Sequence, residues 1–218
     1  MELVLDFTKF ELSELFDGLK LYADLTERQL KVLQAEQKAR LGDKWSTYEE
    51  VFVEGLPTNL RYSVIVALVT NVEWALNHSV GLLEQQGTKP PSRKSRPKGV
   101  SENTHKIQFL NQQGNPPFSH PFEKKFLAIV TVRNAIVHNA GKPERHVATV
   151  GPFDIHLFDD RMEEAAKVLQ PAVVLGATSL WIEEGAVSTW VQEAHEWLSA
   201  LYDFLQLNVS IELPVAPS

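Results

Sequence analysis

The 218-residue chain contains no cysteine. Disulfide bonds, cysteine nucleophiles and thiolate metal sites are therefore excluded. The longest apolar run, residues 64–69, is far shorter than the roughly 18 residues that suggest a membrane span. The N-terminus is acidic and alternates polar with apolar residues, whereas a secretory signal peptide has a basic start and a continuous apolar run. These features predict a cytoplasmic protein that does not bind a membrane.

Several common site motifs are also absent. The sequence has no glycine-rich phosphate loop, no Gly-x-Ser-x-Gly elbow and no dinucleotide-binding fingerprint. The histidines show no metal-ligand spacing, and His195-Glu196 lacks the second histidine of a zinc protease helix. We therefore expect no metal site and no cofactor.

Composition predicts a folded globular protein. The net charge is −7 and 44% of the residues are hydrophobic, so the chain is neither a disordered acidic tail nor a uniformly basic nucleic-acid coat. Any surface that binds a polyanion must be local. Residues 85–106 fit that description, because prolines and glycines prevent a helix there and basic residues gather in them. This basic loop is either a mobile arm that contacts phosphates or a solvated linker. Its candidate nucleic-acid-binding residues are Lys89, Arg93, Lys94, Arg96 and Lys98.

Helix signals dominate the sequence. Four segments match the capping box, in which a hydroxyl and a Glu or Gln three residues later satisfy the first backbone N–H groups of a helix. We expect a helix to start at each of them, and so predict an all-α chain. The four segments begin at Thr8, Thr26, Ser46 and Thr189.

The order of these signals predicts the organisation of the chain. We expect an N-terminal helical extension over residues 1–55, whose first amphipathic part forms two helices or one long broken helix ending near Gly42. A helical domain over residues 56–210 and a tail over residues 211–218 follow. Within the domain, the apolar stretch 64–69 predicts a central core helix over residues 61–83.

The second half of the domain has two further expected features. Strand-forming residues around Gly151-Pro152 predict one small β-hairpin near 147–158. The rest of the domain is expected to be helical, with an interruption near Pro171.

A polar cluster near the end of one apolar helix needs an explanation. The helix is expected to begin near Pro121 or Phe122 and to end around Asn139. Each polar group buried on it without a partner would cost about 1–3 kcal/mol. Asn134 and His138 lie about 40° apart on one face. A protonated His138 beside the cation Arg133 would bind a phosphate and donate a proton to a leaving oxygen.

The segment Arg133-Asn134-Ala-Ile-Val-His138 resembles the Arg-Asn-x-x-x-His motif of the HEPN superfamily. The resemblance covers the motif helix closely and residues 60–207 loosely. It implies a helical bundle of the HEPN type and a homodimer in which two motif helices meet across a two-fold axis. Active members of the superfamily are metal-independent ribonucleases, so the resemblance also implies RNA as a partner.

In this interpretation His138 is the acid and base, Arg133 binds the phosphate, and Asn134 orients either His138 or the phosphate. The reaction is attack of a ribose 2′-OH on the adjacent phosphate. Glu73, which lies on the core helix and faces solvent or a cleft, is a candidate supporting residue. Asn139 is a second one.

Two alternatives stay open. Ala140 stands where a large toxin branch of the superfamily has Tyr, so the chain is alternatively a noncatalytic RNA-binding or protein-interaction module. The motif could also be a chance match, in which Arg133 and His138 bond to neighbouring carbonyls or acids. The biological setting that the resemblance suggests is bacterial defence or a toxin-like system, with a partner protein that restrains the enzyme.

Overall fold

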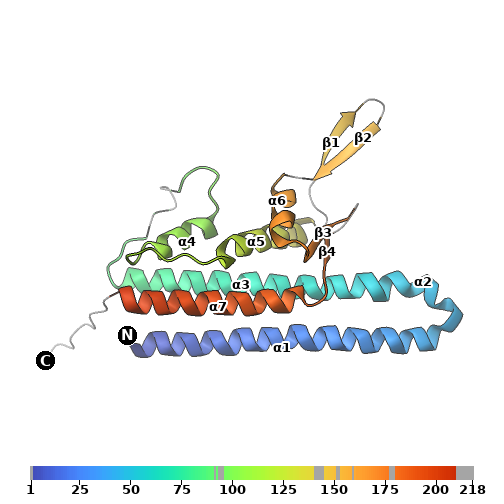
Figure 1. Ribbon diagram of the computed structural model, residues 1–218, viewed down its shortest axis with the longest axis horizontal. Helices are drawn as coiled ribbons and strands as arrows, with labels where there is room; N and C mark the ends of the chain where they lie inside the picture. Colours follow the sequence, from blue (N-terminus) through green and yellow to red (C-terminus); the bar gives the residue numbers. More distant parts are fainter. Residues whose placement is uncertain are drawn as a thin grey trace. The chain divides into compact units, whose positions relative to one another are not determined.

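The computed structural model describes residues 2–90, 92, 96–139, 145–150, 153–158, 160–176 and 180–209. Side chains are described in these ranges except at 2–7, 139, 145–150 and 153–158. The described chain is mostly helical, which confirms the all-α prediction (Figure 1). None of its helices combines the length and the apolar character needed to cross a membrane.

Helices account for most of the elements. They are α1 (Glu2–Leu41), α2 (Trp45–Glu50), α3 (Leu56–Gln85), α4 (Glu102–Asn111), α5 (Phe122–Asn139), α6 (Asp160–Leu169) and α7 (Ala186–Asn208). A 3-10 turn at Gly42–Lys44 and a π turn at Val51–Gly55 connect the first three. The described residues also form four short strands, which pair antiparallel as two hairpins, β1 (Arg145–Val150) with β2 (Phe153–Phe158) and β3 (Val173–Leu175) with β4 (Leu180–Ile182).

Several predicted elements are confirmed. The hairpin expected near 147–158 is β1–β2, and α5 has the predicted bounds. The first segment was expected to form two helices or one long broken helix, and this part of the prediction is wrong, because α1 is a single unbroken helix. Its end at Leu41 agrees with the predicted end near Gly42. Gly42 has a φ of 51°, the left-handed conformation that commonly ends a helix and that glycine adopts without strain.

The second hairpin was not expected, because the segment after Pro171 was predicted to be helical. Pro171 ends α6, since its ring cannot continue a helix. The β-branched Val173 and Val174 then favour an extended chain. Each strand of this hairpin has only three residues, which is too short to show a period-2 pattern in the sequence.

The four capping-box matches were wrong as helix starts. Thr8 and Thr26 lie inside α1, while α2 and α7 begin before Ser46 and Thr189. A capping residue needs a non-helical backbone, and these residues already lie in helical turns. The hydroxyl of Thr189, for example, donates back to a carbonyl oxygen of the preceding turn, 3.1 Å away.

Helix α4 begins at an N-cap that is not one of the four capping-box segments. Ser101 is extended, with φ −69° and ψ 158°, and its Oγ accepts a hydrogen bond from the backbone N–H of Thr104 at 3.1 Å. Residues 102–106 therefore belong to α4, so the loop predicted over residues 85–106 ends before Glu102. Thr104 occupies the position where the capping box requires Glu or Gln.

Contacts divide the chain into two compact units that interleave along the sequence. Unit 1 comprises Met1–Asp17, Thr70–Glu123 and Gln192–Ser218, and unit 2 comprises Gly18–Val69 and Lys124–Val191. The predicted division between an extension and a domain near residue 55 stays a prediction.

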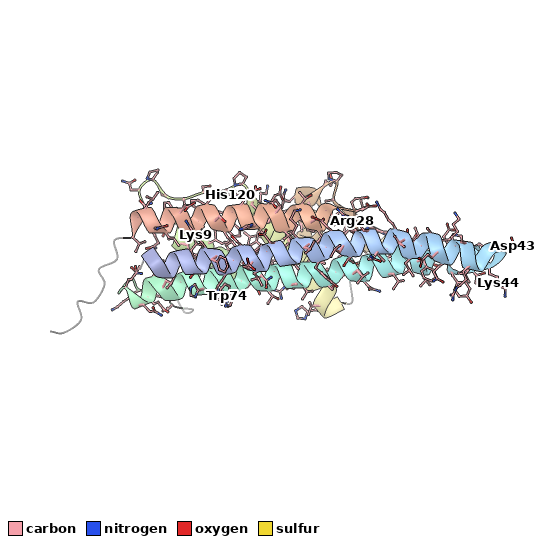
Figure 2. The ribbon with its side chains drawn as sticks, turned by 90° about the horizontal axis from the view of Figure 1, so that it is seen from below. Lys9, Arg28, Asp43, Lys44, Trp74 and His120 are labelled. Atoms are coloured by element: carbon pink, nitrogen blue, oxygen red, sulfur yellow. The ribbon has the colours of Figure 1, made fainter. Side chains whose placement is uncertain are left out.

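Unit 1 packs parts of α1, α3 and α7 side by side (Figure 1). Phe16 of α1 and Trp197 of α7 are almost fully buried in its core. Lys9 of α1 lies next to α7 in Figure 2 and forms an ion pair with Asp203. These contacts attach the start of α1 to α7.

In unit 2, Arg61 joins three elements. Its Nε and Nη2 donate to the two carboxylate oxygens of Glu27 at 2.6 and 2.9 Å, which links α3 to α1. Its Nη1 donates to the carbonyl oxygen of Ile182 in β4 at 2.8 Å. Tyr62 adds a bond from its hydroxyl to the Leu180 carbonyl oxygen at 2.9 Å. Two-pronged arginine–carboxylate bonds are among the strong ones, so this contact fixes β4 against α3.

Tyr202 makes the core of unit 1 sensitive to alkaline pH. Its ring is fully buried, and its hydroxyl donates to the Ala75 carbonyl oxygen at 3.4 Å, beside the hydroxyl of Ser79. Burial raises the pKa of Tyr202 from the ordinary 10.0 to about 12. The unfolded chain therefore loses this proton first, and stability falls as the pH rises from 10 towards 12.

We expect Tyr202→Phe to weaken this alkaline loss, because the variant has no proton to release at this position. At neutral pH it should cost about 0.5–1.5 kcal/mol for the lost hydrogen bond. Urea unfolding of both proteins between pH 7 and 11 measures how steeply the free energy of unfolding of each protein falls with pH. Equal loss of stability in both proteins would show that Tyr202 does not contribute.

Candidate functional site

One face of α5 is anchored in the core of unit 2. Phe126, Ile129 and Val132 each have 0% exposure, and Ala128 and Ala135 are buried beside them. They recur at helical spacing and so form one continuous apolar face. Their burial fixes the rotation of α5 about its axis.

This orientation of α5 determines where the predicted catalytic residues lie. Asn134 and His138 lie on the face opposite Val132 and are exposed to solvent. Val137, next to His138, is 51% exposed. Arg133 lies between the buried and the exposed faces and is half-buried.

The surroundings of these residues bear on the chance-match alternative. Within the described part of the chain, the side chains of Asn134 and His138 make no hydrogen bond or ion pair. His138 therefore does not serve there to satisfy a neighbouring carbonyl or acid. Arg133 does have an interaction partner within the protein. Asn139 is the last residue of α5, and its side chain lies outside the described residues.

Glu73 has a definite contact in unit 1. Its Oε1 accepts a hydrogen bond from Nδ2 of Asn103 at 2.9 Å. Asn103, on α4, is only 7% exposed, so this bond satisfies a buried amide and holds α4 on α3. Asn77, four residues further along α3, is exposed. The part of Glu73 in a catalytic site stays a prediction.

The basic loop exposes its described cations. Lys89, Arg96 and Lys98 are all solvent-exposed, as both the arm and the linker interpretation require. Arg93 and Lys94 lie outside the described residues. Arg96 lines a cavity together with residues of α4, and Lys89 and Lys98 are not part of that lining.

Two residues of this cavity, His105 and Lys106, were not chosen as site residues from the sequence. Both residues lie in the loop predicted over residues 85–106, and in a loop the spacing of residues along the chain does not show which side chains share a face. The signal that could have placed them is Ser101, because a helix starting there puts residues 102, 105, 106 and 109 on one face.

Other histidines have packing roles. His78 forms a 3.3 Å hydrogen bond with Thr8 and stacks on Trp74, and His195 forms a 3.1 Å bond with Ser13. Both pairs connect helices within unit 1. Among the described side chains, no group of three His, Asp or Glu residues is placed to hold a metal ion.

Comparison of the chain with models of known protein families, with curated proteins and with solved structures gives no match.

The contact between Glu73 and Asn103 generates a prediction. Glu73→Gln keeps an oxygen acceptor, so its free energy of unfolding should stay within about 0.5 kcal/mol of the wild type. Glu73→Ala leaves the buried Asn103 amide without this partner and should cost about 1–3 kcal/mol. Chemical denaturation compares the two variants. Equal stability of both variants would contradict the anchoring role of this bond.

Proposed function

We propose that the chain is a metal-independent endoribonuclease of the HEPN type, and that Arg133, Asn134 and His138 form half of its active site. The supporting observation is the orientation of α5, which exposes Asn134 and His138 while the opposite face is fixed in the core. Both side chains are accessible to a large substrate such as RNA.

The chemistry needs only groups of these types. The ribose 2′-oxygen attacks the adjacent phosphorus, and the bond from phosphorus to the 5′-oxygen breaks. A neutral imidazole takes the 2′ proton, and a protonated imidazole supplies one to the leaving 5′-oxygen. The Arg133 guanidinium is a permanent cation that binds phosphate oxygens in pairs and stabilises the charge of the transition state. The products are a 2′,3′-cyclic phosphate and a 5′-hydroxyl end.

A second copy of the chain supplies what one copy lacks. One His138 cannot act at the same moment as base and acid, whereas a two-fold axis beside α5 would bring two histidines and two arginines together. The exposed Val137 supports such a contact, because an apolar side chain next to the site gains from being covered by a partner. We therefore propose a homodimer as the active form.

The second candidate function is a noncatalytic module that binds RNA or another protein. Ala140 favours it, since this position holds Tyr in a large toxin branch of the superfamily. If the chain is an enzyme, the proposed setting is the cytoplasm of a bacterium, in defence or a toxin-like system with a restraining partner protein.

The test is cleavage of a labelled single-stranded RNA in EDTA. His138→Ala should lower the rate by about 100-fold or more, in line with the usual contribution of an acid or base. Its stability should change by less than about 0.5 kcal/mol, because the side chain is exposed. Lys124→Ala is the matched control, because it removes an exposed cation about 21 Å away along the same helix.

The products and the variants distinguish the candidates. Cyclic phosphate ends that are lost in His138→Ala and retained in Lys124→Ala support the ribonuclease. RNA binding without cleavage by a folded wild-type dimer supports the noncatalytic module. Full activity in His138→Ala would contradict the assignment of this residue.

A further inference from the structure

A cavity of about 170 Å³ lies between the basic loop and α4, within unit 1. Arg96 comes from the loop, and His105 and Lys106 come from α4. Pro90 and Phe109 supply apolar wall. None of the residues of the proposed active site on α5 belongs to it.

The N-cap of α4 explains why these groups meet. Because Ser101 sets the start of the helix, Glu102, Lys106 and Phe109 share one face of α4. All three line the cavity. Arg96, from the loop, lines the same cavity.

The cavity has an excess of positive charge. Lys106 is largely shielded from solvent and pairs with Glu102, its Nζ lying 2.6 Å from Oε1. Arg96 has no ion pair within the described residues and is exposed. Two permanent cations therefore face one carboxylate, and the ring of His105 adds a further hydrogen-bonding group.

The volume limits what can enter. Pockets for whole small molecules usually measure about 300–1,000 Å³, which is larger than this cavity. At about 30 Å³ for each water, the space of this cavity corresponds to roughly five or six waters. It therefore suits one end group of a larger molecule. Two cations and an apolar wall fit a phosphate attached to a sugar, since the phosphate pairs with the cations and the carbon skeleton contacts Phe109.

We propose that this cavity binds a terminal phosphate monoester, with Arg96 and Lys106 as its cations. The phosphate belongs to the end of an RNA strand or to a free phosphate ester; the choice of RNA rests on the proposed function. The bound phosphate takes the place of Glu102 as the partner of Lys106. Glu102 is therefore a competitor inside the site.

The experiment measures binding in the His138→Ala chain in EDTA, so that cleavage does not interfere. The probes are two hexauridylates with a fluorescent label at the 3′ end, one with a 5′-phosphate and one with a 5′-hydroxyl. Fluorescence anisotropy measures how tightly each probe binds. We expect the phosphorylated probe to bind at least about fivefold more tightly, since charge-assisted hydrogen bonds to a phosphate are stronger than hydrogen bonds between neutral groups. Arg96→Ala and Lys106→Ala should abolish the difference between the two probes.

Two further variants separate a defined site from a diffuse basic surface. Glu102→Gln should increase the preference for the phosphorylated probe, because the competing carboxylate is gone. Lys98→Ala is the matched control, since it removes an exposed cation of the same loop that does not line the cavity. It should weaken both probes alike and leave the preference unchanged.

The outcomes show which kind of molecule supplies the phosphate and whether the cavity binds it. Displacement of the phosphorylated probe by uridine 5′-monophosphate or inorganic phosphate at low concentration would assign the site to free phosphate esters as well. If these compounds do not displace the phosphorylated probe, the site is assigned to the phosphate at the end of an RNA strand. Equal affinity for both probes in the unmutated cavity, or equal effects of Lys98→Ala and Arg96→Ala, would overturn the proposal. None of these results depends on whether the chain cleaves RNA.

Discussion

Burial of one face of α5 determines where its polar residues point. Phe126, Ile129 and Val132 are fully enclosed, and their spacing allows only a narrow range of rotation about the helix axis. A rotation by one residue, about 100°, would bring the Arg133 position to the buried face, where an unpaired charge costs several kcal/mol. The exposed face of Asn134 and His138 is thus a consequence of core packing.

The same principle places the cavity residues on α4. Ser101 fixes where that helix begins, and the bond between Asn103 and Glu73 fixes its side against α3. With start and rotation set, Lys106 has to lie on the face beside the loop. In both places, apolar or capping residues that take no part in chemistry decide which polar residues become accessible.

The sequence predicts well what depends on long periodic patterns. The bounds of α5, the common face of Asn134 and His138, and the β1–β2 hairpin all follow from helical spacing or from clear turn signals. It predicts poorly what depends on a single local contact. The start of α4 was missed because a Ser–Thr pair replaces the capping box. In α1 the capping box predicted a helix start where there is none. The motif that begins at Thr8 lies inside one long helix, and Thr8 packs near α3.

The central proposal is that the exposed face of α5 becomes an active site only when a second copy covers it. The most direct test measures the RNA cleavage rate per chain over a range of protein concentrations, with the dimer fraction determined by sedimentation in the same buffer. If the dimer is the active form, the rate per chain rises in proportion to the dimer fraction. A constant rate per chain, maintained at concentrations where sedimentation shows only monomer, would contradict it.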